Sequence, residues 1–288
     1  MRFARPFLGL ITAALLAACA RPPAPAPSST NGFCRLTVAG SQVVLASGQP
    51  VTLHGASLPT LAEMARAGEA PIARIQALAG AGARLVSLAI DDSELTPLYF
   101  PEKLAPVLQA ANAAGIVVIL SYRIRLQTAN QSASNAEIDN AEDFLKLALG
   151  YVNSAPGIWF DPILEINEIP PVRRRNVAQR MVDIVRGYRA DNIMLIRQPA
   201  WFRESDPNLA APLSGGNIVY ALSPAETAAG LPPTQAPFLR ITTLPPGQNM
   251  TLSLSAPGAT TTDPAWARAC TLKGPRKRGA WWRCASTA

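Results

Sequence analysis

Short runs of apolar residues, many of them β-branched, alternate along the chain with longer runs whose apolar residues recur at helical spacing. In one longer run, Leu104, Val107, Leu108 and Ala111 would form a single apolar stripe that packs on a sheet. Alternation of strands and helices favours a parallel sheet with crossover helices, and eight such strands close a (β/α)8 barrel. The predicted strands are Val51–Gly55, Arg84–Ile90, Ile116–Ser121, Pro162–Glu168, Ile193–Arg197, Asn217–Leu222, Pro237–Thr242 and Gly279–Cys284.

Local signals add detail to this predicted barrel. Cys34–Val38 and Val43–Ala46 flank a Gly-Ser pair, which predicts a β-hairpin that plugs the amino-terminal mouth. Ser134 and Glu137 form a capping-box pattern at the start of the third helix. Prolines follow the fifth and sixth predicted strands, so the helices there are expected to be short. These prolines are Pro207, Pro212, Pro224, Pro232 and Pro233.

Residues 1–18 have the pattern of a bacterial lipoprotein signal peptide. Two arginines precede the apolar stretch Phe7–Leu16, and Ala17-Ala18 stand directly before Cys19, as in a lipobox. We therefore expect a lipid on Cys19. A signal peptide cleaved nearby is one alternative; a membrane helix is the other, but the apolar stretch is too short to span a bilayer.

The predicted lipid anchor fixes the rest of the domain organisation. Residues 19–32 are rich in Pro and Ser and form a spacer, and residues 33–288 have the size of one barrel domain. We expect a lipoprotein of the cell envelope, and Ala20 after the cysteine favours the outer membrane. The domain would face an oxidising compartment.

Charge and cysteine content narrow the classes of partner. The formal net charge is +7, with basic clusters at Arg173–Arg175 and Lys273–Arg278, but no aromatic residues interleave with them, which disfavours nucleic acid. Solvated helix faces, or attraction to anionic lipid or polysaccharide, explain the charge better. Beyond Cys19, three cysteines allow at most one disulfide, and the short loop favours Cys270 with Cys284. The sequence has one histidine and no metal-ligand spacing, so we expect no metal and no cofactor.

The candidate chemistry lies at the ends of the predicted strands. Glu168, preceded by Asn167, ends a strand at the face where barrel enzymes carry their active sites; alternatively, Glu168 forms a structural ion pair with Arg173 or Arg197. Aromatic rings near strand ends are predicted to form platforms for sugars or to belong to the core. These rings are Trp201, Tyr220 and Trp282. Arginines near strand ends suit an anionic glycan or balance local acids. They are Arg123, Arg125, Arg197 and Arg240.

Four segments resemble, in order, motifs of glycoside hydrolase family 5, the cellulase-like family of retaining (β/α)8-barrel glycosidases. They are Leu45–Gly55, Ile72–Ile90, Ala111–Ser121 and Asn217–Tyr220. The resemblance implies that Glu168 is the acid/base and that Asn167 binds the 2-hydroxyl of the sugar. It also implies a polysaccharide or oligosaccharide as the ligand.

Other catalytic positions of the family are replaced in this chain. The second-strand arginine aligns with Ser87, the third-strand histidine with Tyr122–Arg125, the sixth-strand histidine with Ser223 and the nucleophile with Thr242-Thr243. No Asp or Glu occurs from Thr227 to Thr262. A retaining glycosidase needs two carboxylates about 5 Å apart. The other acids near that rim are Asp91, Asp92 and Glu204, and none has a precedent at its position in the family. Asp91 and Asp92 are better explained as helix-cap or loop residues.

The sequence leaves three hypotheses open. The first is an envelope-anchored, catalytically degenerate barrel that binds a glycan or acts as a scaffold. The second is an active glycosidase that hydrolyses a β-linked polysaccharide with Glu168 as acid/base. The third is a structural lipoprotein that binds a protein partner.

Overall fold

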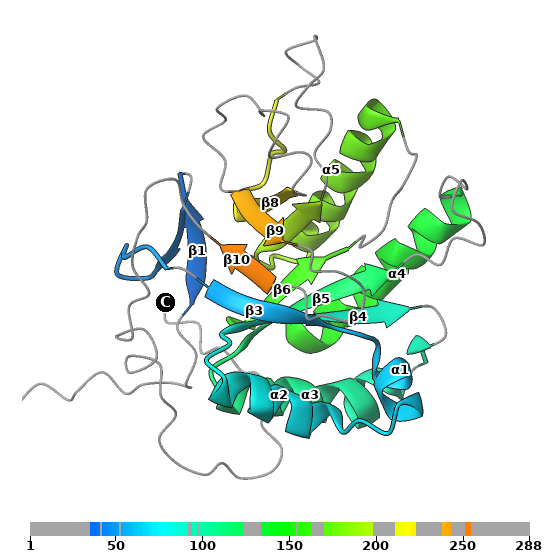
Figure 1. Ribbon diagram of the computed structural model, residues 1–288. Helices are drawn as coiled ribbons and strands as arrows, with labels where there is room; N and C mark the ends of the chain where they lie inside the picture. Colours follow the sequence, from blue (N-terminus) through cyan, green and yellow to red (C-terminus); the bar gives the residue numbers. More distant parts are fainter. Residues whose placement is uncertain are drawn as a thin grey trace, which may run out of the picture. The chain divides into compact units, whose positions relative to one another are not determined.

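The computed structural model describes residues 35–40, 42–51, 53–91, 94–96, 98–123, 134–153, 155–162, 170–197, 211–222, 238–242 and 251–254, the last two ranges and residue 222 by their backbone. Eight strands close into a barrel (Figure 1). In order around the barrel they are β3 (Leu53–Leu58), β4 (Leu85–Asp91), β5 (Val117–Arg123), β6 (Ile158–Asp161), β7 (Met194–Arg197), β8 (Ile218–Leu222), β9 (Phe238–Thr242) and β10 (Thr251–Leu254).

The predicted (β/α)8 fold is confirmed, with a correction at its last strand. Neighbours from β3 to β9 pair in parallel, whereas β10 pairs antiparallel with both β9 and β3. Only residues 243–250 separate β9 from β10, which is too short for the crossover that a parallel pair requires. The eighth place is therefore occupied by Thr251–Leu254; the predicted strand Gly279–Cys284 lies outside the described residues.

The fourth barrel strand also differs from its predicted range. β6 spans Ile158–Asp161, before the predicted strand Pro162–Glu168, of which only Pro162 is among the described residues. Ser121 of β5 pairs with Asp161, and Phe160 pairs with Met194 of β7. The ladder stops before Pro162 because proline has no N–H to donate to a neighbouring strand.

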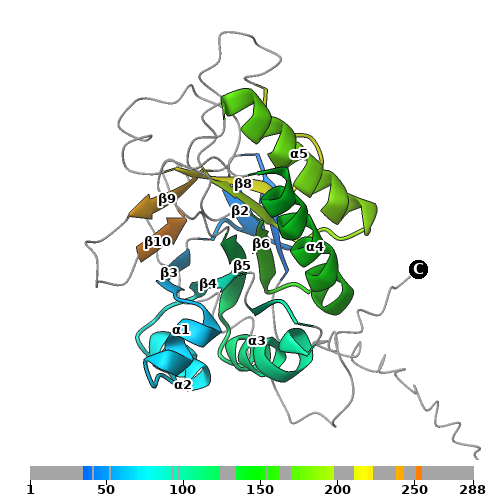
Figure 2. The same cartoon turned by 90° about the vertical axis from the view of Figure 1, so that its right-hand side faces the viewer.

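The described helices lie outside the barrel along its lower and right-hand sides in Figure 2, and none of them lies over β9 and β10. They are α1 (Leu61–Arg66), α2 (Pro71–Gly80), the π-helix η2 (Tyr99–Leu104), α3 (Ala105–Ala113), α4 (Asn135–Val152) and α5 (Pro171–Gly187). The predicted capping box at α4 is confirmed: the Glu137 N–H donates to Ser134 Oγ at 3.2 Å, and the Ser134 N–H donates to Glu137 Oε2 at 2.6 Å. The helices predicted to be short would follow β7 and β8, outside the described residues.

The two faces of each strand supply two apolar layers. In β5, Val118, Leu120 and Tyr122 pack against the helices, whereas Val117 and Ile119 belong to the cluster inside the barrel. This alternation follows from the period of two in a strand. It identifies which side chains point into the barrel, and so which can reach its mouth.

The predicted plug is confirmed at the amino-terminal end of the barrel. Strands β1 (Leu36–Ala39) and β2 (Gln42–Leu45) form an antiparallel hairpin. Its Leu36, Val43 and Leu45 belong to the interior cluster, together with the first residues of the barrel strands. The hairpin closes this end of the barrel.

Candidate functional site

The barrel interior changes from apolar to polar toward the carboxyl ends of the strands. Ser87 of β4, Ser121 of β5, Asp161 of β6 and Arg197 of β7 follow the inward apolar positions of their strands. The Ser87 and Ser121 hydroxyls are 2.7 Å apart, and Ser121 Oγ donates to Asp161 Oδ2 at 3.0 Å. Arg197 Nε donates to the same carboxylate oxygen at 2.5 Å. A continuous polar chain therefore crosses four neighbouring strands.

The Asp161 and Arg197 side chains, which form the charged part of this polar series, are deeply buried. The Asp161 side chain is 1% exposed, and that of Arg197 is 11% exposed. Burial raises the pKa of Asp161, and the Arg197 charge and the hydrogen bonds from Arg197 and Ser121 oppose that rise. Asp161 Oδ1 and Arg197 Nη2 are buried without a hydrogen-bond partner. The pair is thus half satisfied, which is uncommon for buried charged groups.

A second polar cluster lies at the carboxyl end of β4 and the start of α1. The Glu94 carboxylate accepts hydrogen bonds from the backbone N–H of Ala62 at 2.8 Å and of Asp91 at 3.3 Å. Burial raises the pKa of Glu94, with further contributions from Asp91 and Glu63, although its two backbone hydrogen bonds oppose the rise. The carboxylate of Glu94 therefore fastens α1 to the rim of the barrel.

Arg123 joins this cluster from the end of β5. Its Nη1 donates to Glu63 Oε1 at 3.0 Å. Burial alone would raise the pKa of Glu63, but the Thr60 N–H and Arg123 lower it overall. Arg123 and Arg197 thus both lie at strand ends, as predicted, and each pairs with an acid of the chain. This matches the alternative that such arginines balance local acids.

Tyr220 does not line the mouth of the barrel. It is 1% exposed and packs in the outer layer between sheet and helices, and the Leu213 N–H donates to its hydroxyl at 2.8 Å. Tyr220 points outward because its neighbours Val219 and Ala221 face the interior. The prediction of a sugar platform at Tyr220 is therefore corrected to its alternative, a core aromatic.

Several predicted site residues lie outside the described residues. They are Cys19, Arg125, Asn167, Glu168, Trp201 and Trp282, with Asp92 and Glu204. The backbone of Arg240 lies in β9, in register with Leu222, but its side chain is not described. The roles of these residues remain predictions.

Sequence reasoning missed Asp161, Ser121, Glu63 and Glu94. Ser121 and Asp161 interrupt inward apolar positions of their strands, and this break in a period of two was the signal available. Asp161 was not predicted as a site residue because the predicted strand began at Pro162, directly after it. In the described part of the chain, no group of His, Cys, Asp or Glu is arranged to hold a metal ion. Over the same residues, no helix is long and apolar enough to cross a membrane.

Comparison with known proteins agrees with this architecture. The solved structures it resembles include a β-glucanase from Saccharophagus degradans in complex with cellotetraose, at 18% identity and a TM-score of 0.56, covering 70% of this chain and 66% of that one. The catalytic domain of a Thermobifida fusca endoglucanase is similar at 20% identity and a TM-score of 0.55, covering 66% and 64%. At this identity the likeness shows the fold alone.

The family assignment comes from the sequence model. This chain spans just under two thirds of the length of those two solved structures. No curated protein matches it. The model of the cellulases of glycosyl hydrolase family 5 matches residues 44–222, which is more than half of the chain. The chain therefore belongs to glycoside hydrolase family 5.

Proposed function

We propose that this protein is a catalytically degenerate member of its family that binds a glycan at the carboxyl-terminal mouth of the barrel without hydrolysing it. It does so as a lipoprotein held to the cell envelope through Cys19. The activities of family relatives do not transfer directly, because the chemistry depends on residues that this chain replaces.

The sequence of β9 carries this proposal. β9 is the seventh strand of the barrel, paired in parallel with β8, and it reads Phe-Leu-Arg-Ile-Thr. The family nucleophile belongs at the end of this strand, yet no Asp or Glu occurs from Thr227 to Thr262. Without a second carboxylate about 5 Å from the acid/base, neither the covalent intermediate nor its hydrolysis has a route.

The acids of the described interior support the same reading. Asp161 is held by Arg197 and Ser121 through one oxygen, and Asp91 is fully buried. The family nucleophile belongs to the seventh barrel strand, whereas Asp91 lies on the second and Asp161 on the fourth. The described polar residues thus serve to hold and orient a bound glycan, and binding requires no more than this.

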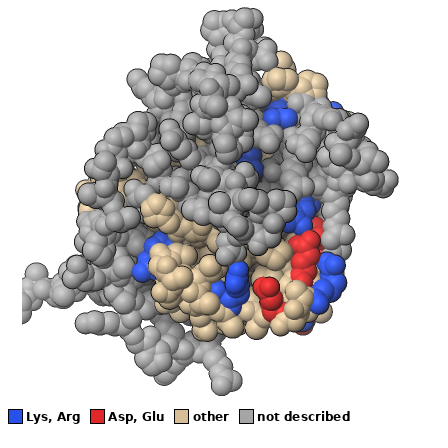
Figure 3. All heavy atoms as spheres, in the orientation of Figure 1, with Lys and Arg blue, Asp and Glu red and all other residues tan. Residues whose placement is uncertain are grey.

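The pairing of the two strand-end arginines whose side chains are described favours a neutral glycan over an anionic one. Arg123 is neutralised by Glu63 and Arg197 by Asp161. On the face in Figure 3, described acidic and basic side chains lie next to each other and form no patch of a single sign. A neutral β-linked glucan, the class to which the cellotetraose of the Saccharophagus β-glucanase belongs, is therefore the proposed ligand.

Titration calorimetry of the purified mature protein with cellotetraose, laminari- and manno-oligosaccharides, and an anionic oligosaccharide tests this proposal. We expect saturable binding of at least one neutral β-glucan fragment, weakened when Asn167 or Glu168 is replaced by Ala. Binding of none of these sugars would contradict the proposal and favour a protein-binding lipoprotein. Selective binding of the anionic sugar would refute the neutral class.

A further inference from the structure

We propose that Asp161 and Arg197 form a hydroxyl-binding site inside the carboxyl half of the barrel, where one hydroxyl of a neutral glycan bridges Asp161 Oδ1 and Arg197 Nη2. This inference rests on the proposed function, and it names the residues that hold the ligand at the floor of the mouth.

The site is defined by two buried atoms without partners. Asp161 Oδ1 can only accept and Arg197 Nη2 can only donate, and both are buried without a hydrogen bond. Most buried polar atoms have at least one hydrogen-bond partner, because an unmade bond leaves the loss of water uncompensated. The ion pair of Asp161 and Arg197 therefore leaves one acceptor and one donor available to a polar occupant.

The geometry of the pair explains why the two atoms face the same occupant. The Nε and Nη2 of a guanidinium lie on one edge of its plane, and a carboxylate normally accepts from both in a fork. Here Arg197 Nε donates to Asp161 Oδ2 at 2.5 Å, whereas Nη2 and Oδ1 remain unpaired. One of the two hydrogen bonds of the fork is therefore formed and the other is not. The unformed one leaves Nη2 as a donor and Oδ1 as an acceptor on the same edge of the pair.

A hydroxyl group suits this opening. Its oxygen accepts a hydrogen bond from Nη2 while its proton is donated to Oδ1. Because the two side chains carry opposite charges, the site has no net charge and favours a neutral group over an ion. The Arg197 side chain is 11% exposed and that of Asp161 is 1% exposed, so the approach is from the arginine side.

The remaining bonds of the site hold the carboxylate in place. Ser121 Oγ donates to Oδ2, and the Ser87 hydroxyl contacts Ser121 Oγ at 2.7 Å. These contacts come from three neighbouring strands, and strands position side chains more rigidly than loops do. The acceptor Oδ1 is thus fixed before the ligand arrives, which lowers the entropic cost of binding.

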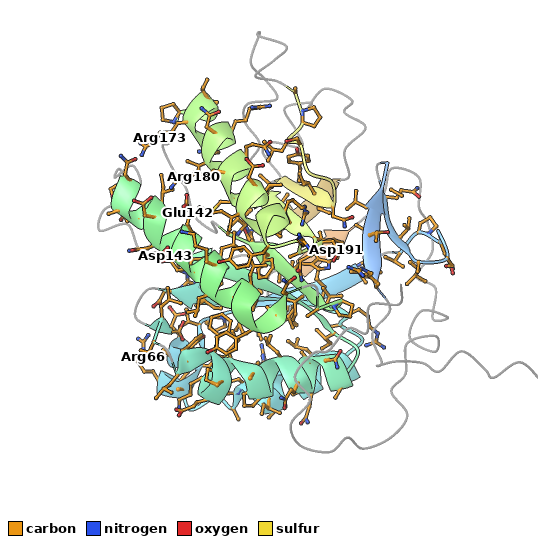
Figure 4. All side chains as sticks on the ribbon, turned by 180° about the vertical axis from the view of Figure 1, so that it is seen from behind. Arg66, Glu142, Asp143, Arg173, Arg180 and Asp191 are labelled. Carbon is orange, nitrogen blue, oxygen red and sulfur yellow. The ribbon has the colours of Figure 1, made fainter. Side chains whose placement is uncertain are left out.

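The test compares binding of cellotetraose to the mature protein and to three variants by titration calorimetry. Asp161→Asn replaces the carboxyl group by a neutral amide of the same shape, and Arg197→Lys keeps the charge but removes the planar fork. The matched control is Glu142→Gln, because Glu142 on α4 is a buried carboxylate that accepts from Arg180 Nη2 of α5 at 2.8 Å outside the barrel (Figure 4).

We expect Asp161→Asn and Arg197→Lys to weaken cellotetraose binding by about 10- to 100-fold, the loss of one hydrogen bond to a charged group. Glu142→Gln should bind as the wild type does. Deoxy analogues of cellotetraose sharpen the result: for the analogue that lacks the bridging hydroxyl, wild type and Asp161→Asn should bind equally.

Other outcomes overturn the inference. If the Asp161 and Arg197 variants bind as tightly as wild type, the occupant is a water and the inference is wrong, although the proposed function stands. Equal weakening in Glu142→Gln would indicate general destabilisation and has the same consequence. If the wild type does not bind cellotetraose, the proposed ligand is wrong and this inference is wrong as well.

A second measurement covers the case in which Asp161→Asn does not fold. The ¹³C-carboxyl NMR signal of Asp161 is recorded in the wild type with and without cellotetraose. A change in its chemical shift on saturation supports direct contact, whereas an unchanged signal overturns the inference.

Discussion

Glu94 shows how a single buried carboxylate couples stability to pH. Its pKa is raised in the folded protein, first by burial and further by Asp91 and Glu63. The folded state therefore binds more protons than the unfolded state, and stability falls as pH rises from below 4.5 through the folded-state pKa.

Glu94→Gln should remove this pH dependence. We expect the wild type's advantage in unfolding free energy over the variant to be greatest near pH 4 and to shrink toward pH 7, because glutamine does not ionise. Chemical denaturation across that range measures it. Glu102→Gln, at an exposed position, is the control. An advantage that stays constant or grows with pH would be inconsistent with a raised pKa.

Gly55 is required by the close packing of two strands. A Cβ at this position would lie 1.6 Å from the carbonyl oxygen of Leu85 on β4. Gly55→Ala should therefore lower the free energy of unfolding by about 3 kcal/mol or more. Gly150→Ala, in α4 with no heavy atom within 4 Å of the new Cβ, should instead stabilise by about 0.5–1 kcal/mol. Similar effects of both substitutions on urea denaturation would refute this account.

Residue roles were predicted less well than residue locations. Arg123 and Arg197 were correctly placed at strand ends, because strand ends can be recognised in the sequence. Their partners Glu63 and Asp161 lie far away in the chain, so pairing depended on the closed barrel. Tyr220 could face either side until the register of β8 was known.

At the scale of elements, features that depend on neighbouring residues were predicted correctly, whereas features that depend on pairing between distant segments were not. The capping box at Ser134 was predicted correctly because it involves only neighbouring residues. The prediction did not include Ile158–Asp161, because two apolar segments flank Pro162 and either could form a strand. The predicted strand Pro162–Glu168 lies outside the described residues except for Pro162. The eighth barrel strand was wrong because Thr251–Leu254 pairs with β3, which lies far earlier in the chain.

The cap of α4 can be tested directly. Ser134→Ala removes the side-chain acceptor of the Glu137 N–H and should lower the free energy of unfolding by about 1 kcal/mol. Ser134→Asp keeps an acceptor at this position and should be close to wild type in the same urea denaturation. Equal losses in both variants would argue against the cap.

At the scale of the whole molecule, the predicted lipid anchor would set where the barrel works. Acylation requires the thiol, so Cys19→Ser should leave the protein unprocessed or soluble instead of bound to the membrane. Partition into detergent and the mass of the mature protein measure this. If the variant partitions as wild type does, the protein is not a lipoprotein.

The barrel has the fold of its family, and its two ends differ in what they carry. The hairpin closes the amino-terminal mouth through Leu36, Val43 and Leu45, and the proposed ligand site lies at the opposite end of the strands. Family membership and the interior polar chain from Ser87 to Arg197 fit a binding site there. The sequence of β9 lacks the acid that turnover needs. Binding without hydrolysis is therefore the central claim.

The rate of cellotetraose hydrolysis tests this claim most directly. Product formation by purified wild type and by Glu168→Gln is followed by anion-exchange chromatography over long incubation. Loss of one member of a catalytic pair usually costs several orders of magnitude in rate, so we predict no hydrolysis by wild type above that of the variant. Clear hydrolysis by wild type that Glu168→Gln abolishes would contradict the claim and show that a second carboxylate acts in this barrel.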